Sequence, residues 1–226
     1  MITILLAIAA CDAPRAACDP IRHDLANASM TIDRPQMPAL APEDDARAGV
    51  KRESTVGEAI LAPRPGADDD PVLSSIFAEV VARGGRVTPL YRTLALSPTL
   101  LRAWKTFSWE LRDGASAPRS VRELMILRIL QLAQAKAEFA IHEGLGLKAG
   151  LSPNQIEHLA HWHRSDDYTP PDKAALAVAE QIFAGPASRP AMLELKRHFS
   201  DREVMELTMT ASFYVMLVRF TQSLRL

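Results

Sequence analysis

The sequence predicts an all-α fold, a bundle of about seven or eight helices that follows a largely irregular N-terminal extension. Apolar residues recur at helical spacing in one segment after another, and Ser-Pro pairs and glycines separate those segments. No segment shows the alternation of apolar and polar residues that is typical of a half-buried strand. The composition agrees, because Leu, Ala and Met are plentiful while aromatic residues make up only 6% of the chain.

The N-terminal extension is expected to span residues 1–70. Its segments RPQMPALAPEDDARAG and LAPRPGADDD are rich in Pro, Ala and Asp. Such segments bury too little apolar surface to offset the entropy lost on ordering, so we expect most of the extension to be disordered. The first residues, MITILLAIAAC, are similar to the end of a lipoprotein signal, but the apolar run is short and no basic region precedes it. We therefore expect a cytoplasmic protein, with export as the alternative.

The helical domain is expected to span residues 71–226, and its first half contains three helices. DPVLSSIFAEVVARGG carries its larger apolar residues on one face and ends at a Gly-Gly pair. SPTLLRAWKTFSWELRDG begins with Ser97 as N-cap and Pro98 in the first turn, and it ends at Gly114. SVRELMILRILQLA is apolar almost all round, which indicates a central buried helix.

The second half of the domain continues the same pattern. QAKAEFAIHEGLGLKAG ends at Gly150, SPNQIEHLAHWH begins with another Ser-Pro pair, and PPDKAALAVAEQIFAG is amphipathic. SDREVMELTMTASFYVMLVRFTQSL opens with a capping box formed by Ser200 and Glu203. Residues 117–149 and 201–224 together offer more apolar helix face than one small bundle needs, which favours a homo-oligomer.

The charge of the chain gives no reason to expect nucleic acid or a membrane as a partner. The formal net charge is −1, and no apolar run approaches the roughly 20 residues of a membrane-spanning helix. A metal site is not expected either, since three clustered histidines lack further ligands at suitable spacing: His158, His161 and His163. Three aromatic residues on one helix are expected to pack or to face a partner, with a substrate wall as the alternative: Trp104, Phe107 and Trp109.

A carboxylate and an imidazole stand one helical turn apart in an otherwise small or apolar stripe. Glu138 and His142 share this stripe with Ala135, Leu145 and Ala149, at alternating steps of three and four residues. If the pair is buried, each group can satisfy the other, and two titratable groups in contact are suited to general acid–base chemistry. The alternative is a surface Glu–His pair on a half-exposed helix.

Glu123 is the second carboxylate of interest, and two interpretations remain open for it. Ser120-x-x-Glu123 reads as a capping box at the start of an apolar helix. Alternatively, Glu123 joins His142, although an unbroken helix would hold the two about 28 Å apart. They can meet only if the chain turns near 134–136, and no Gly or Pro marks a turn there.

The stretch SVRELMILRILQLAQAKAEFAIHEGLGLKAGLS resembles the core of the carboxymuconolactone decarboxylase and alkylhydroperoxidase superfamily. The shared pattern is an Arg-Glu pair in an apolar helix, an acidic and aromatic stretch, a His three residues after the aromatic, and an Ala-Gly-Leu-Ser stop. The resemblance extends over about residues 85–226, including LALSPTLLRAW and TASFYVMLVRF. It implies a helical bundle that assembles as trimers or hexamers.

The redox residues of the peroxidase members are missing from this chain. Those members carry Cys-x-x-Cys-x-x-x-His on the stripe and a glutamate near the start of the preceding helix. Here the two Cys positions hold Ala135 and Glu138, while His142 and Glu123 occupy the other two positions. Because a peroxide-reducing cycle needs a thiolate, and Cys11 and Cys18 lie in the extension, an alkylhydroperoxidase-type antioxidant is the least favoured function.

Cysteine-free members of the superfamily resemble its decarboxylase branch, which reads acid-aromatic-acid-aromatic before the His. Here Glu138 and Phe139 keep the second pair, while Lys136 and Ala137 replace the first. We consider Lys136 and Phe139 as candidate substrate-binding residues. Lys136 has two alternatives: a solvated surface side chain, or Schiff-base chemistry.

These observations predict a cofactor-free enzyme that acts on a small oxygenated acid or lactone by decarboxylation, isomerisation or hydration. The resemblance assigns His142 and Glu138 as proton donor and acceptor, and Glu123 as the residue that orients the imidazole. All three are expected in one apolar-lined pocket, which requires a turn between residues 133 and 137 or a group from a neighbouring subunit. The alternative is a non-catalytic oligomeric binding or scaffold protein.

Overall fold

The computed structural model describes residues 59–64 and 70–226, all of which belong to one compact unit, Ser54–Leu226. The described residues contain nine α-helices and no strand, which confirms the all-α fold class. Most of the expected extension at 1–70, with Cys11 and Cys18, lies outside the described residues. No helix in the described part of the chain has the length and apolar character needed to cross a membrane.

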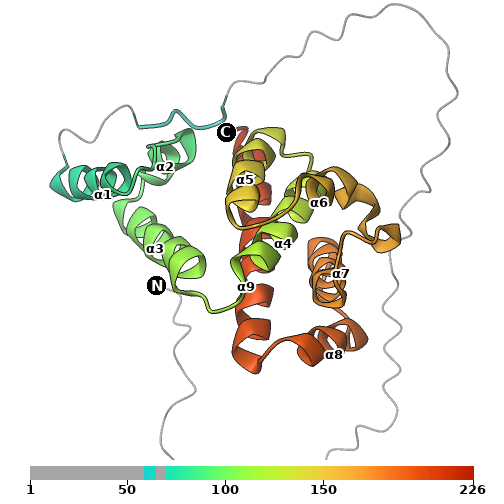
Figure 1. Ribbon diagram of the computed structural model, residues 1–226. Helices are drawn as coiled ribbons and strands as arrows, with labels where there is room; N and C mark the ends of the chain where they lie inside the picture. Colours follow the sequence, from blue (N-terminus) through green and yellow to red (C-terminus); the bar gives the residue numbers. More distant parts are fainter. Residues whose placement is uncertain (1–58, 65–69) are drawn as a thin grey trace, which may run out of the picture. The chain divides into compact units, whose positions relative to one another are not determined.

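Figure 1 shows the helices α1 to α9. A π-helical turn follows α3 and a 3₁₀ segment follows α6. Their bounds are α1 Pro71–Ala82, α2 Pro89–Leu94, α3 Pro98–Trp109, η1 Glu110–Gly114, α4 Arg119–Leu132, α5 Lys136–Lys148, α6 Pro153–Glu157, η2 His158–Arg164, α7 Pro170–Ala184, α8 Arg189–His198 and α9 Asp201–Leu224. The short helices α2 and α8 are additional to the segments identified from the sequence, and α2 has only six residues, too few for a clear apolar period.

Local capping explains where most helices begin. The side chain of Asp70 accepts hydrogen bonds from the backbone N–H groups of Val72 and Leu73 at the start of α1. The expected capping box of Ser200 and Glu203 is present at the start of α9. Ser97 is the N-cap of α3, as expected, although its side chain makes no capping hydrogen bond among the described residues.

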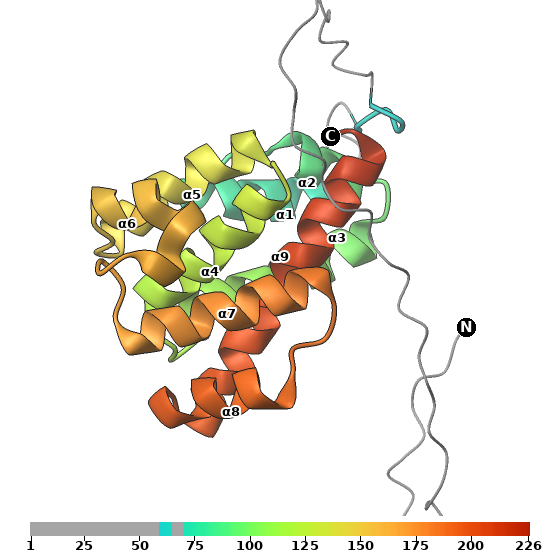
Figure 2. The same ribbon diagram turned by 90° about the vertical axis from the view of Figure 1, so that its right-hand side faces the viewer.

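The core is built around α4, which packs against α5, α7 and α9 (Figure 2). Its side chains are buried almost all round, as the apolar sequence predicted, and Leu124, Leu127 and Leu130 are fully inaccessible. Burial of each such leucine contributes about 1.5–3 kcal/mol. The helix that carries Glu123 is therefore held rigidly from several sides.

A tight turn joins α4 to α5 without Gly or Pro. Gln134 adopts the left-handed conformation, with φ of 56°, which reverses the chain direction. The backbone N–H of Ala135 donates to the carbonyl of Leu130 at 2.9 Å, and the Gln222 amide of α9 donates to the carbonyl of Ala133 at 2.6 Å. The turn expected between 133 and 137 is thus present within this one chain, and it places α5 alongside α4.

Candidate active site

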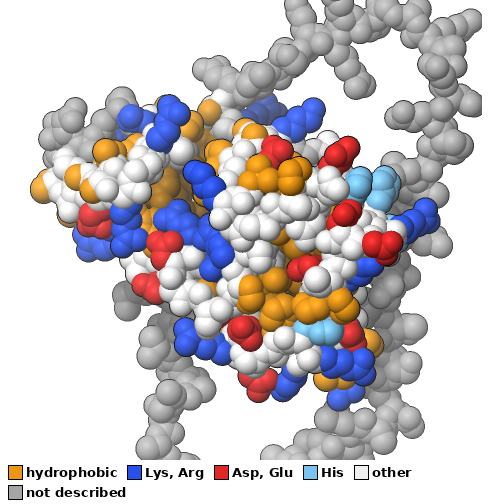
Figure 3. All heavy atoms as spheres, in the orientation of Figure 1, with side chains coloured by type: hydrophobic (Ala, Val, Ile, Leu, Met, Phe, Trp, Pro, Cys, Tyr) orange, Lys and Arg blue, Asp and Glu red, His pale blue; other side chains and the backbone are white. Residues whose placement is uncertain are grey.

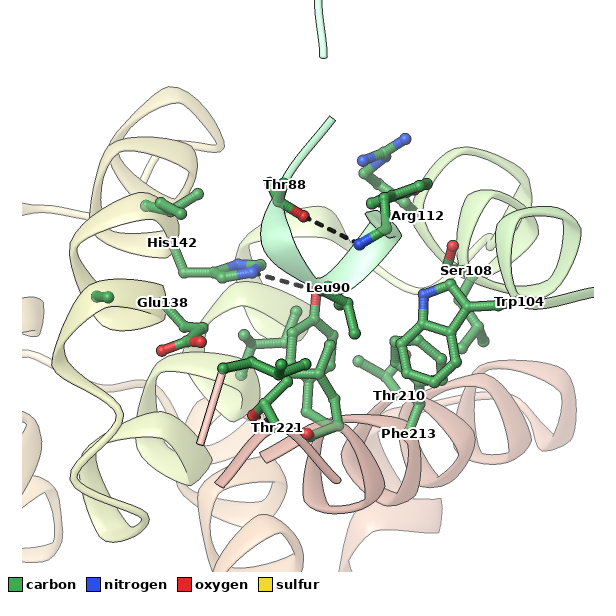
Figure 4. Close-up of a pocket in the computed structure, with 18 of the residues that line it drawn as sticks. Thr88, Leu90, Trp104, Ser108, Arg112, Glu138, His142, Thr210, Phe213 and Thr221 are labelled. Carbon is green, nitrogen blue, oxygen red and sulfur yellow. Dashed lines mark hydrogen bonds between the residues drawn. The ribbon is translucent and has the colours of Figure 1, made fainter. Parts of the chain in front are cut away.

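A cavity of about 420 Å³ lies between α2, α3, η1, α4, α5 and α9. Figure 3 shows a hollow lined with hydrophobic side chains, with Lys and Arg side chains beside it. The cavity wall combines aromatic and aliphatic residues such as Leu90, Trp104 and Phe213 with titratable groups that include Glu138 and His142. Figure 4 shows that these groups enter from opposite sides, His142 and Glu138 from α5, and Trp104 from α3. The pocket therefore has a polar end and an apolar end.

Glu123 and His142 form a hydrogen-bonded pair at the polar end. The Nδ1 of His142 lies 2.8 Å from Oε2 of Glu123, whose side chain is completely buried, while the imidazole retains 12% exposure on the cavity wall. With the carboxylate ionised, Nδ1 carries the hydrogen and donates it to Glu123. The other ring nitrogen, Nε2, is then left as a hydrogen-bond acceptor on the neutral imidazole.

The charge of the buried Glu123 is balanced by Arg119, one turn earlier on α4. The Nη2 of Arg119 lies 2.5 Å from Oε1 of Glu123, and Nη1 donates to the carbonyl of Arg112 at 2.9 Å. Pairing of this kind offsets the large cost of removing a carboxylate from water. The capping-box interpretation of Glu123 is wrong, because α4 has Pro118 as its N-cap and the Glu123 carboxylate faces Arg119 and His142.

Tyr214 of α9 contacts the other side of the imidazole. Its hydroxyl lies 3.2 Å from Nε2 of His142, and the two rings meet edge to face with centroids 5.0 Å apart. Burial raises the pKa of the Tyr214 phenol well above its ordinary value, and the nearby Glu123 carboxylate raises it further. The phenol is therefore neutral and donates its hydrogen to Nε2.

Sequence reasoning did not identify Tyr214 or Arg119. A signal for Tyr214 was present, since α9 carries a stripe at helical spacing that lines the cavity: Thr210, Phe213, Tyr214, Leu217 and Thr221. Tyr214 is the tyrosine of that stripe, and a buried tyrosine hydroxyl usually forms a hydrogen bond.

Glu138 lines the same cavity, but it is not the hydrogen-bond partner of His142. Among the described residues no hydrogen bond joins the two, because the His142 ring reaches across to Glu123 on α4 and Tyr214 on α9. Glu138 is half-buried and lies in the first turn of α5 (Figure 4). The expectation that Glu138 and His142 satisfy each other is thus corrected: Glu123 takes that place.

The two candidate substrate-binding residues lie away from the cavity. Lys136, the first residue of α5, is exposed, and neither Lys136 nor Phe139 is among the described residues on the cavity wall. Phe139 packs instead against the hydrophobic clusters around α4. Ala137, which lies between these two residues in the sequence, does line the pocket. Because alanine is much smaller than the aromatic residue of the family pattern, it leaves space in the pocket at this position.

The aromatic residues of α3 divide between the cavity and the surface. Trp104 lines the cavity and packs on Phe213, with ring centroids 4.9 Å apart. Trp109 lies beneath two cations, the guanidinium of Arg83 at 4.2 Å and the Lys105 ammonium at 4.8 Å from its ring centroid. Trp104 therefore forms a wall of the pocket, whereas Trp109 packs elsewhere.

The described residues contain no cluster of three or more His, Cys, Asp or Glu side chains that could hold a metal ion. His158, one of the three histidines considered for a metal, is hydrogen bonded through Nδ1 to Asp167 at 2.6 Å. That hydrogen bond raises the pKa of His158 above its ordinary value. His158 therefore belongs to an exposed ion pair with Asp167.

Comparison with known proteins agrees with this architecture and with the motif around the site. Residues 98–181 match the model of the carboxymuconolactone decarboxylase family, and this range contains Glu123, Glu138 and His142. This match, together with the similar fold of AhpD-like structures, supports the carboxymuconolactone decarboxylase and alkylhydroperoxidase-like superfamily. The uncharacterized protein YdfG of Bacillus subtilis (strain 168) is 29% identical over 98 residues, which cover 42% of this chain and 67% of that protein.

Solved structures of other proteins share the fold. An uncharacterized peroxidase-related protein from Silicibacter sp. TM1040 has a TM-score of 0.62 and 16% identity, over 74% of this chain and 89% of that chain. The debrominase Bmp8, solved with 2,3,4-tribromopyrrole, has a TM-score of 0.62 and 16% identity, over 74% of this chain and 91% of that chain. At these identities the similarity shows the fold alone.

Proposed function

We propose that this protein is a cofactor-free enzyme that performs acid–base chemistry on a small oxygenated acid or lactone. The observation that carries the proposal is the buried Glu123–Nδ1 hydrogen bond, which leaves Nε2 of His142 directed at Tyr214 on the cavity wall. A carboxylate that fixes the tautomer of an imidazole is a common way to prepare a general base.

The proposed reaction uses the imidazole as a proton store. A proton next to a substrate carbonyl is removed, and the imidazolium that forms is stabilised by Glu123, 2.8 Å away. The same proton can then return to the enolate, either at a new position or after loss of CO2. Decarboxylation, isomerisation and hydration share this machinery. Arg119 neutralises the second oxygen of Glu123, so that the carboxylate remains available to the imidazole.

The cavity wall favours a substrate with an anionic group and an apolar body. Three arginines line the cavity, Arg112, Arg119 and Arg122, against the pocket carboxylate of Glu138. Arg119 is paired with Glu123, and Arg122 donates to backbone carbonyls that include that of Ala117 at 3.0 Å. The Arg112 guanidinium contacts the exposed Asp113 at 3.3 Å, so its remaining donors are the ones we assign to a substrate carboxylate.

The apolar end of the pocket suits the rest of such a molecule. Trp104, Leu90 and Phe213 form the wall opposite α5 (Figure 4). Apolar walls with a few polar groups are typical of small-molecule sites, because burial supplies affinity while the polar groups set orientation. Arg112 therefore replaces Lys136 as our candidate for binding the substrate carboxylate, since Lys136 is exposed and is not on the cavity wall.

A non-catalytic oligomeric binding protein is the second candidate function. The observation that favours it is the departure at Lys136 and Ala137 from the acid-aromatic pattern of the decarboxylase branch. A thiol peroxidase is less favoured, since Ala135 and Glu138 stand at the cysteine positions. Hydroperoxide turnover that disappears when Cys11 or Cys18 is replaced would reverse that order.

The test is turnover of carboxymuconolactone and related lactone acids, followed by loss of ultraviolet absorbance and by release of CO2. The wild-type protein should turn over at least one of them, and His142→Ala should lower that rate roughly 100-fold or more. His198→Ala is the matched control, because His198 is also partly buried and contacts a glutamate, Glu194, at 3.3 Å, away from the cavity. Equal loss in both variants would contradict the role of His142, and tight binding of these acids without turnover would favour the binding-protein alternative.

A further inference from the structure

We propose that the hydroxyl of Tyr214 is the group that passes the proton between His142 and the substrate. The inference rests on the proposed acid–base function and extends it, because the imidazole would then act on the substrate through the phenol. Tyr214 would be a catalytic residue that touches the reacting atoms, with His142 and Glu123 behind it. Tyr214 lies in the C-terminal stretch TASFYVMLVRF, 72 residues from His142, and no catalytic role was expected for it from the sequence.

The hydrogen bonds of His142 leave it no free nitrogen to meet a substrate. Nδ1 is bonded to Glu123 at 2.8 Å, and Nε2 is bonded to the Tyr214 hydroxyl at 3.2 Å. The Tyr214 ring stands at 90° to the imidazole, and both residues line the cavity. Figure 4 shows the dashed bond from His142 running into the pocket, toward the space below Leu90. A molecule in the cavity can therefore approach the phenol oxygen at the end of the chain Glu123–His142–Tyr214.

The charges around Tyr214 keep its phenol protonated before reaction. Glu123 on α4 disfavours the phenolate, and burial disfavours it more strongly. Arg119 and Arg122 on α4 and Arg112 on η1 act in the opposite direction, but they do not outweigh the first two effects. A neutral phenol donates its hydrogen to Nε2 and keeps a lone pair on oxygen, which is the arrangement needed to receive a second proton.

The proposed step is balanced without any further reactant. The substrate C–H bond next to the carbonyl breaks, and its proton forms an O–H bond on Tyr214. At the same time the original O–H bond of Tyr214 breaks, and that proton forms an N–H bond at Nε2 of His142. The products are an enolate, a neutral tyrosine and an imidazolium paired with Glu123. Reversal of the step delivers a proton from Tyr214 to the enolate.

The hydrogen bond itself can be tested without a substrate. Nitrogen NMR of histidine-labelled protein should show Nδ1 protonated and Nε2 unprotonated in His142 at neutral pH. Tyr214→Phe should move the Nε2 resonance of His142, because it removes the donor while keeping the ring. Tyr168→Phe is the matched control: Tyr168 is another buried tyrosine with its pKa raised to about 12, and its hydroxyl donates to the carbonyl of Gln155, outside the cavity wall. An unchanged His142 spectrum in Tyr214→Phe would overturn the proposal.

Proton transfer is then measured by exchange of the carbon-bound hydrogen of carboxymuconolactone in heavy water. Tyr214→Phe should slow exchange roughly 100-fold, with Tyr168→Phe near the wild-type rate. Fluorotyrosine at position 214 should shift a limb of the pH profile in the direction of the lower phenol pKa, which a structural role would not do. If His142→Ala abolishes exchange while Tyr214→Phe retains it within about threefold, the role of Tyr214 is disproved and the proposed function stands. If His142→Ala also retains exchange, the proposed function itself fails.

Discussion

The carboxylate of Glu123 and the imidazole of His142 lie 2.8 Å apart, although 19 residues separate them in the chain. The contact exists because Gln134 reverses the chain and lays the first turns of α5 against α4. Glu123 is fully buried on the rigid central helix, while His142 stands at the cavity wall. The pair thus joins the core of the protein to its pocket.

Replacement of Glu123 by Gln should lower turnover by about 10–100-fold, which is less than the loss expected for His142→Ala. The amide oxygen can still accept the Nδ1 hydrogen, but it cannot balance the imidazolium or Arg119. Steady-state kinetics on the best lactone acid checks this. The matched control is the double variant Arg119→Gln with Glu123→Gln, which should recover part of the stability lost in the single variant. A Glu123→Gln protein with wild-type kcat would contradict the orienting role.

Replacement of Gln134 by Gly should stabilise the protein by up to about 1 kcal/mol, because glycine adopts a positive φ without the steric cost of a side chain. Gln134→Val should destabilise it, since a β-branched residue is poorly accommodated at a φ of 56°. Urea denaturation of the three proteins measures the order. If Gln134→Val matched the wild type, the turn would have another conformation in solution.

The stability of the fold should fall in acid partly through Glu206. Burial alone would raise the pKa of this carboxyl, but hydrogen bonds from Arg202 and from the backbone N–H groups of Ala117 and Ser116 outweigh burial and hold it below the ordinary value. A lowered folded-state pKa means that the unfolded chain binds the proton more tightly. The stabilisation is therefore complete above the ordinary carboxyl pKa and is lost as the pH falls through the folded-state pKa.

Glu206→Gln should accordingly lower the urea midpoint at neutral pH and flatten its decline between about pH 5 and about pH 2. Glu143→Gln, at an exposed position on α5, serves as the control and should follow the wild-type curve. Parallel curves for the wild type and Glu206→Gln would show that the hydrogen bonds from Ser116 and Ala117 to Glu206 do not contribute to the loss of stability in acid.

We propose that the protein is a homo-oligomer, a trimer or a hexamer, as the superfamily resemblance implies. Three methionines of α9 are 40–54% exposed and share one face of the helix, at Met205, Met209 and Met216. Exposed apolar stripes of this kind are typical of interaction surfaces. Light scattering at micromolar concentration should give a mass at least three times that of the chain, and Met209→Glu should reduce it. A wild-type monomer would contradict the proposal.

The sequence by itself determined the helical fold and much of the motif. Ser-Pro starts, capping boxes and apolar periods are local signals, since each depends on residues within a turn or two, and they placed the starts of α3 and α9 at Pro98 and Asp201. The resemblance also identified Glu123 and His142 as site positions.

Only the tertiary structure decided which groups meet. Glu138 is one turn from His142, yet the imidazole pairs with Glu123 and Tyr214, because α4 and α9 pack against each other and place these side chains on the two sides of the ring. The turn at Gln134 contains no Gly or Pro by which the sequence could predict it. Hydrogen bonds with the backbone of α4 and with Gln222 of α9 stabilise it. Contacts across 19 and 72 residues depend on how the helices pack together, and the local pattern within any one helix does not contain that information.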